Sequence, residues 1–294
     1  MNIDWFYVLE IALSGLGTGG LYALTGLAFV IIYKSTRVVN LAIGDMLMIG
    51  AYLFFAFSAG MGLPLWVAVP AALLAMAGLG AVVERAIIRP MLGESPISSF
   101  MVTVGLSSIL VGMVELIWTA DQRRLPEFLP TKPIQLGEAF LPPKVFYGFW
   151  IAVALIAVVL LTFRFWRGGI ALRATASDQG AAYSMGINVP RVFSLSWSFA
   201  ALIAGVAGIV VGAIGGLSSS MGVFGLSVLV VVIVGGLDSV LGALVAGLFV
   251  GLSEALAGAF LGGEYKLLAT FSLLVLILLV RPYGLFGTHE IERL

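Results

Sequence analysis

Long apolar runs, separated by short polar segments, are the feature that most constrains the fold of this chain. A helix rises 1.5 Å per residue, so about 20 apolar residues are needed to cross the hydrocarbon core of a bilayer. Charged residues make up only 10% of the chain, against roughly 25% in soluble domains. The sequence therefore predicts an all-α, polytopic helical membrane protein.

Nine of these runs are candidate transmembrane helices. One of them, 222–236, is short enough to be re-entrant, so we expect eight to ten spans. The first run, 5–33, is longer than a bilayer requires, and we expect it to be tilted or broken near its glycines. Broken or re-entrant helices are expected around a central translocation pathway. The candidate spans are 5–33, 41–59, 64–88, 97–119, 146–165, 191–215, 222–236, 239–261 and 266–281.

The distribution of Lys and Arg between the loops predicts the orientation, because cytoplasmic loops carry an excess of these residues. With nine spans and a cytoplasmic C-terminus, ten of the 15 Lys and Arg residues lie inside and five lie outside. We therefore expect the N-terminus outside and the C-terminus in the cytoplasm. The main external loop is then 120–145 and the main cytoplasmic segment is 167–190. No linker suggests a separate soluble domain, so 1–294 is predicted to be one membrane domain.

Several kinds of function are excluded by residue types and motifs that the sequence lacks. Cysteine is absent, which excludes disulfides and thiolate metal sites. The single histidine, His289, lies in the polar C-terminal tail, where we expect it to be solvated. The sequence has no P-loop and no catalytic motif, and a net charge of zero does not point to nucleic acid. We therefore expect neither an enzyme nor a metal site.

Glycines spaced four residues apart recur along the apolar runs, among them Gly15 and Gly19 in the first and Gly247 and Gly251 in the eighth. Small residues at this spacing let helix backbones approach closely in lipid. The pattern predicts a tightly packed helical bundle, and it fits equally well with helices that slide or rock during transport.

The segment ALRATASDQGAAYSMGI, 171–187, is the most informative polar stretch. One short helix is predicted from about 175 to 185, with Ser177 or Asp178 as its N-cap. Gly186 fits the position that stops such a helix. The segment fits either an ordinary amphipathic connector or a surface helix that docks into a groove of a partner protein.

The stretch VVNLAIGDMLMIGAYL, 38–53, places two polar side chains at the start of an apolar run. Asn40 is predicted to be the N-cap of a helix that begins near Leu41. Asp45 is expected about one turn inside that helix, where the positive end of the helix dipole favours an anion. Within this stretch, GDMLMIGA, 44–51, faintly resembles LDSVLGA, 237–243, as duplicated halves of a transporter would.

Ionisable side chains within the apolar runs are further candidates, because a charge inside a membrane is costly and usually faces a cavity or a partner. Glu254 is the deepest of them, and either a place in the pathway or a polar contact between helices fits its position. Glu84, beside Arg85, is expected to form a local ion pair near the inner membrane edge. Thr103 and Ser107 offer hydroxyl groups to a polar substrate in the pathway.

Three sequence blocks follow one another in a definite order. They are N-L-A-I-G-D-x-x-x-x-G-A-Y at 40–52, A-L-R-A-x-A-x-D-x-x-A-A-x-x-M-G-I-N at 171–188, and V-G-G-L-D-S-x-x-G-A at 234–243 with R-P-Y-G-L-F-G at 281–287. Together they resemble the membrane permease of ATP-binding-cassette importers for branched-chain amino acids, over nearly the whole chain. The chain departs from that family at Leu41 and Ile43, which replace a Phe and a His, and at Gly180, which replaces the Glu of the importers' E-A-A motif.

This resemblance implies a division of labour between several chains. A second permease, either a sister subunit or another copy, would complete the pore, two ATPase subunits would bind the cytoplasmic face, and a soluble binding protein would deliver substrate. ATP and Mg would bind to the ATPases, so no cofactor is expected in this chain. The implied location is the bacterial inner membrane, in contact with lipid.

The resemblance also implies two sets of site residues. Those expected to dock the ATPases are Arg173, Asp178, Ala181, Ala182, Met185 and Gly186. Those expected along the pathway or its gate are Asn40, Gly44, Asp45, Thr103, Ser107, Gly235, Gly236, Asp238 and Glu254.

Other functions fit the same composition. An ion-coupled secondary transporter would have similar helices but would need no ATPase, and a channel would pass its solute without ATP. Within the importer family, the substrate can also be urea, a short amide or an aromatic carboxylate, because the binding protein sets much of the specificity.

Overall fold

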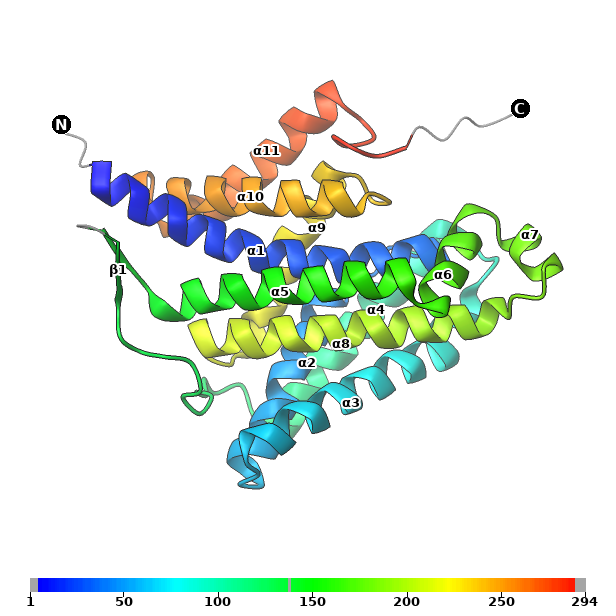
Figure 1. The fold of residues 1–294 in the computed structure, drawn as a ribbon, viewed down its shortest axis with the longest axis horizontal. Helices are drawn as coiled ribbons and strands as arrows, with labels where there is room; N and C mark the ends of the chain where they lie inside the picture. The colour runs from blue at the N-terminus through cyan, green and yellow to red at the C-terminus, as the bar shows by residue number, and fades with distance from the viewer. Residues whose placement is uncertain (1–4, 137–138, 289–294) are drawn as a thin grey trace. The chain divides into compact units, whose positions relative to one another are not determined.

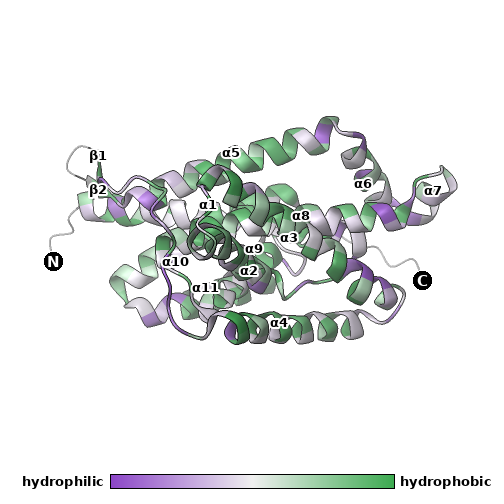
Figure 2. Cartoon of the chain, turned by 90° about the horizontal axis from the view of Figure 1, so that it is seen from below, coloured by the Kyte–Doolittle hydropathy of each residue, from purple (hydrophilic) through white to green (hydrophobic). Residues whose placement is uncertain are grey.

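The computed structural model describes residues 5–136 and 139–288, so His289 lies outside the described residues. Helices dominate this part of the chain (Figure 1), and most of their lengths are hydrophobic (Figure 2). The α-helices are α1 (Trp5–Thr36), α2 (Ile43–Phe55), α3 (Leu65–Val83), α4 (Pro96–Trp118), α5 (Pro143–Phe165), α6 (Arg167–Ser177), α7 (Gln179–Ser184), α8 (Val189–Gly215), α9 (Phe224–Gly235), α10 (Val240–Phe260) and α11 (Lys266–Val280).

Short π-helical or 3₁₀-helical turns adjoin several of these helices. The π-helical turns are η1 (Ala56–Gly60), after α2, and η2 (Glu84–Ile88), after α3. The 3₁₀ turns are η3 (Arg89–Met91), η4 (Ser219–Val223) before α9, and η5 (Gly263–Tyr265) before α11. The predicted external loop contains a hairpin of β1 (Ile134–Leu136) and β2 (Ala139–Leu141), paired antiparallel with Ile134 opposite Leu141.

Eight helices of the described residues are long and apolar enough to cross a membrane, and each falls on a predicted run. The remaining run, 222–236, corresponds to a shorter apolar helix, Ser219–Gly235. The prediction of a polytopic helical membrane protein with eight to ten spans is therefore confirmed. α1 is continuous from Trp5 to Thr36, so the alternative of a break near its glycines is wrong.

The chain forms two compact units, each assembled from separate stretches of sequence. Unit 1 comprises Met1–Val30, Leu129–Val153 and Ser227–Leu294, and unit 2 comprises Ile31–Phe128 and Ala154–Leu226. The long helices α1 and α5 contribute residues to both units. The organisation of 1–294 as a single membrane domain stays a prediction.

Within unit 2, α8 packs against both α2 and α3. Glycines permit this approach: Gly205 of α8 faces Gly50 of α2, and Gly208 faces the backbone of Leu47. A β-carbon at Gly208 would overlap the Leu47 carbonyl oxygen. Close backbone packing of this kind holds helices together in lipid, where apolar side chains gain little by leaving the hydrocarbon.

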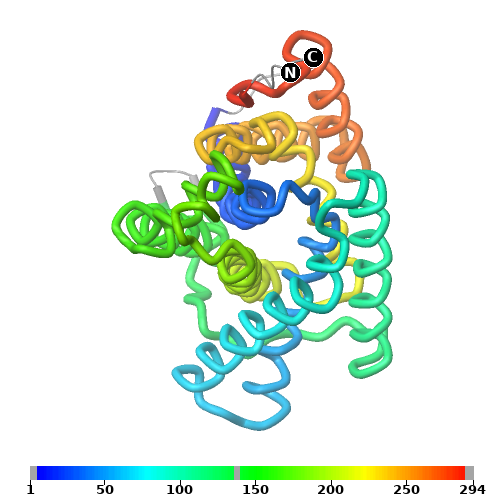
Figure 3. The backbone as a smooth tube through the Cα atoms, turned by 90° about the vertical axis from the view of Figure 1, so that its right-hand side faces the viewer, coloured from blue at the N-terminus to red at the C-terminus, as the bar shows by residue number. Residues whose placement is uncertain are grey.

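Within unit 1, the first part of α1 lies beside α10 (Figures 1 and 3). Gly15 faces the Gly251 carbonyl and Gly19 faces the Gly247 carbonyl, so the glycine pairs singled out in the sequence do meet across one helix interface. The close packing predicted from the spacing is confirmed for these helices.

Candidate functional site

Asn40 lies in the loop before α2 and is fully buried. Its side-chain oxygen accepts a hydrogen bond from the Ala42 backbone N–H at 3.1 Å, and its amide nitrogen lies 3.5 Å from Met46 Sδ. The helix begins at Ile43, with Ala42 in the cap position and no side-chain cap bond. The prediction that Asn40 is the N-cap is therefore wrong. Its side chain stabilises a turn ahead of the helix instead, as Asn often does.

Thr103 of α4 holds the same loop from the other side and is also fully buried. Its hydroxyl oxygen accepts a hydrogen bond from the Leu41 backbone N–H at 3.3 Å. The hydroxyl can donate to the Phe100 carbonyl at 2.9 Å or the Val39 carbonyl at 3.1 Å. One side chain thus ties the entry of α2 to α4.

Replacing Thr103 with valine, which has nearly the same shape, should lower the free energy of unfolding by about 1–3 kcal/mol, because the Leu41 N–H loses its acceptor in a buried site. Thermal unfolding of the purified protein in detergent would measure the loss. Thr103→Ser keeps the hydroxyl and should lie much nearer to wild type. Equal stability of the serine and valine variants would contradict this role.

Asp45 lies in the first turn of α2 and is only 5% exposed. Its carboxylate lies against Gly222, and Gly44 packs on the backbone of Gly222 and Gly225, where any β-carbon would overlap. Ser107 of α4 is near enough to interact with the carboxylate.

The positive end of the α2 dipole favours an anion in the first turn, where Asp45 lies. The structure therefore gathers five of the predicted pathway residues into one cluster in unit 2. These are Asn40, Gly44, Asp45, Thr103 and Ser107.

The predicted residues Gly235, Gly236 and Asp238 form the turn between α9 and α10 in unit 1. Gly236 has a φ of +105°, which suits glycine, and it packs on the backbone near Gly287. Asp238 accepts hydrogen bonds from the backbone N–H and the hydroxyl of Thr288. The sequence block at 281–287 thus lies against the turn, although the two blocks are far apart in the chain.

The faint repeat of 44–51 and 237–243 does not place the two aspartates equivalently. Asp45 is inside α2, whereas Asp238 precedes α10, whose N-cap is Ser239 with its hydroxyl accepting from the Gly242 N–H at 3.0 Å.

Glu254 of α10 is 7% exposed and lies in a cage of hydroxyl donors in unit 1. Tyr22 donates to Oε2 at 2.5 Å, while Ser227 and Thr270 donate to Oε1 at 2.8 Å and 2.5 Å. Such donors stabilise a carboxylate away from water. The polar contact between helices that the sequence allowed is therefore present, and it joins α1, α9, α10 and α11.

The predicted docking segment forms two helices, α6 and α7, rather than one helix over 175–185. The break falls at Asp178, whose Oδ1 accepts from the Ala181 N–H at 2.9 Å and caps α7, which confirms one of the two predicted N-caps. Gly186 follows α7 with a φ of +83°, as expected of a glycine that stops a helix. Figure 2 shows this segment as more polar than the long helices.

Exposure divides the predicted docking residues. Met185 is 84% exposed, and its neighbour Tyr183 is 72% exposed. Ala182 instead packs with Val189 and Phe193 and is only 4% exposed, so its side chain stabilises the fold and does not offer a surface. Arg173 donates hydrogen bonds to carbonyls at the end of α5, at Phe163 and Arg164.

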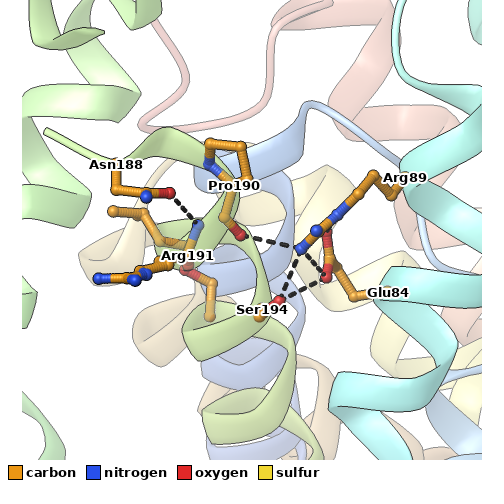
Figure 4. Close-up of polar contacts among 8 residues, drawn as sticks. Glu84, Arg89, Asn188, Pro190, Arg191 and Ser194 are labelled. Atoms are coloured by element: carbon orange, nitrogen blue, oxygen red, sulfur yellow. Dashed lines mark hydrogen bonds and ion pairs between the residues drawn. The ribbon is translucent and has the colours of Figure 1, made fainter.

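Glu84 is completely buried, and its ion pair is with Arg89, not with the predicted Arg85. Arg89 donates from Nε at 2.9 Å and from Nη2 at 2.8 Å to the two carboxylate oxygens. The same Nη2 lies 2.8 Å from Ser194 Oγ and 3.1 Å from the Pro190 carbonyl, and Ser194 donates to Glu84 at 2.6 Å. Figure 4 shows this clamp between η2 and the first turns of α8, with Arg191 extending away from it.

The predicted pathway residues fall into two groups, one in unit 2 and one in unit 1. The sequence singled out Glu254 and Glu84 but missed their partners, which are Tyr22, Ser227 and Thr270 for Glu254 and Arg89 and Ser194 for Glu84. A signal did exist, since each of these is a polar side chain within or at the end of an apolar run.

The helices and their buried polar clusters define a polytopic membrane protein of the transport class. The family described as "Branched-chain amino acid transport system / permease component" matches residues 11–280. The chain therefore belongs to the branched-chain amino acid transport permease family, as the three sequence blocks predicted.

Full-length relatives agree with this assignment. The chain is 31% identical to the high-affinity branched-chain amino acid transport system permease protein LivH of Salmonella typhimurium, and equally to LivH of Escherichia coli K12, with all of each chain covered. It is 29% identical to BraD of Pseudomonas aeruginosa, with 98% of both chains covered. A solved structure, PsaBC from Streptococcus pneumoniae in complex with Fab, has a TM-score of 0.50 at 12% identity over 95% of this chain and 93% of that one, which shows a shared fold.

Proposed function

We propose that this chain is the transmembrane subunit of a binding-protein-dependent importer that carries branched-chain amino acids inward at the expense of ATP hydrolysed by other chains. The observation that carries the proposal is the match to the permease family over 11–280, together with relatives of the same full length. The sequence has no P-loop of its own, so the nucleotide must bind to separate ATPases.

The segment formed by α6 and α7 is the proposed contact with the ATPases. It is polar, it projects exposed apolar side chains at Tyr183 and Met185, and the distribution of Lys and Arg favours a cytoplasmic position for it. α8 follows directly, and Arg89 joins its first turns to η2, so a push on α7 can reach α3 and α8 as a rigid-body movement. A second permease completes the pore and a soluble protein delivers the amino acid.

The test is uptake of labelled leucine into proteoliposomes that contain this chain together with the second permease and the two ATPases of its transport system. ATP and the loaded binding protein should both be required for uptake, and an ionophore should leave it unchanged. Uptake driven by an ion gradient without ATPases would indicate a secondary transporter, and passive flux would indicate a channel. The same assay with urea, short amides and aromatic carboxylates tests the other substrates.

The variant that carries Tyr183→Ala and Met185→Ala should lose at least tenfold of its ATP-dependent uptake, because the apolar surface proposed to dock is removed. Its elution profile in size-exclusion chromatography should be unchanged, since both side chains are exposed. Leu116→Ala, at an 87% exposed residue of α4, is the matched control and should transport normally. Unchanged uptake by the double variant would contradict the docking role.

A further inference from the structure

Unit 1 contains a cavity of about 480 Å³ lined by α1, α10, η5, the start of α11, and Phe140 and Pro142 at the end of the β-hairpin. On the α10 side the lining combines Glu254 with small residues, namely Gly251, Ala255, Gly258 and Ala259. The sequence analysis did not predict this site.

Charged groups of both signs line the cavity. The Glu254 carboxylate lies on one side, and Lys266 reaches the cavity with its methylene chain packed on Gly258. Gly258 is four residues beyond Glu254 in α10. At a rise of 1.5 Å per residue, the backbone positions of these two residues are about 6 Å apart along the helix axis. Glu10 of α1 also lines the cavity, with its Oε1 accepting from the Phe140 N–H at 2.5 Å.

The charges are not paired with each other. In the part of the chain that the structure describes, Lys266 is not within ion-pair distance of Glu254 or of Glu10. Glu254 accepts from two hydroxyls at Oε1 but from one at Oε2, and a carboxylate oxygen can accept two hydrogen bonds. An acceptor position therefore remains on the carboxylate that lines the cavity.

We propose that this cavity binds an α-amino acid as the zwitterion, with its ammonium group on Glu254 and its carboxylate on the Lys266 ammonium. A zwitterion carries opposite charges a few ångströms apart, so it can bridge an acidic and a basic side chain that line the same cavity. The small residues and Ile11 leave an apolar surface for the side chain of the ligand. This inference rests on the proposed function and adds a binding site within the membrane subunit.

Binding should be measured on the assembled complex without the binding protein, by isothermal titration with three probes. The probes are L-leucine, 3-methylbutylamine, which lacks the carboxylate, and 4-methylpentanoate, which lacks the ammonium. Wild type should bind leucine at least tenfold more tightly than either analogue. Equal affinity for the amine and leucine would overturn the assignment of Lys266.

Lys266→Met is the main variant, because this side chain is exposed and its loss should not unfold the protein. It should weaken leucine binding at least tenfold and leave binding of 3-methylbutylamine unchanged. Lys144→Met is the matched control, since Lys144 belongs to the same unit but is not among the cavity-lining residues. Glu254→Gln should weaken binding of both leucine and the amine.

The transport assay separates failure of this site from failure of the proposed function. If wild type shows ATP-dependent leucine uptake but Lys266→Met neither binds leucine more weakly nor transports it more slowly, the site is wrong and the function stands. If wild type shows no ATP-dependent uptake of leucine, the proposed function itself is wrong.

Discussion

Replacing Arg89 with alanine should lower the free energy of unfolding by about 3 kcal/mol, the lower end of the range for breaking a buried ion pair. The Glu84 carboxylate is completely buried, and Arg89 supplies its counter-charge and two of its hydrogen bonds. The arginine side chain is 37% exposed, which is why the lower end of the range applies. Without the guanidinium, a charged group would remain in an apolar site with Ser194 as its remaining hydrogen-bond donor among the contacts described above.

Steric-trap unfolding in bicelles would measure this change directly. Arg85→Ala is the matched control, because Arg85 lies on the same turn, is exposed, and is not bonded to Glu84 in the structure. It should change stability by less than about 0.5 kcal/mol, as surface substitutions usually do. Adding Glu84→Gln to Arg89→Ala should restore part of the loss, since no buried charge then remains. Similar losses for the two arginine variants would show that the clamp does not stabilise the unit.

Replacing Gly208 with valine should prevent α2 and α8 from packing as they do in unit 2. Even the first carbon of a side chain would overlap the Leu47 carbonyl oxygen, which belongs to helix backbone and cannot rotate away. Overpacking of a well-packed interface costs about 1–3 kcal/mol and occasionally more. Because the obstruction is helix backbone, Gly208→Val should lower the free energy of unfolding by about 3 kcal/mol or more, and Gly208→Ala by about 1–3 kcal/mol.

Gly112 provides the control for the glycine substitution itself. It lies within α4, and a β-carbon there would meet nothing within 4 Å. Gly112→Ala should therefore be neutral or stabilising, because alanine is favoured over glycine in a helix by about 1 kcal/mol. Thermal unfolding of Gly208→Ala and Gly112→Ala in the same detergent would compare them. A stable Gly208→Ala protein would mean that α8 can move away from α2 at little cost.

The helices could be predicted from sequence because the bilayer sets their length, and an apolar run of that length has few alternatives. The close packing of α1 on α10 could also be predicted, because glycines four residues apart lie on the same face of a helix. The Asp178 cap and the Gly186 stop were also predictable, because both depend on neighbours within a few residues.

Partners that are distant in sequence could not be predicted in this way. Nothing near Glu84 distinguished Arg85 from Arg89, and the choice depends on a π-helical turn and on Ser194 from another helix. The N-cap assignment of Asn40 failed because Thr103, on α4, organises the loop and delays the start of α2. Ala182 was expected to offer a surface, but its side chain packs on Val189 and Phe193 of α8. These neighbours belong to another helix, so the sequence around Ala182 did not reveal the contact.

Membrane insertion through eight to ten spans could be predicted from the amino-acid sequence, and the three sequence blocks indicated the permease family. Both follow from local properties: apolar length, residue spacing and short motifs. Which polar side chains meet depends instead on how the helices pack: Glu254 meets Tyr22, Ser227 and Thr270, and Glu84 meets Arg89 and Ser194. In lipid a buried carboxylate must find its hydrogen-bond donors on neighbouring helices, and packing alone determines which helices are neighbours.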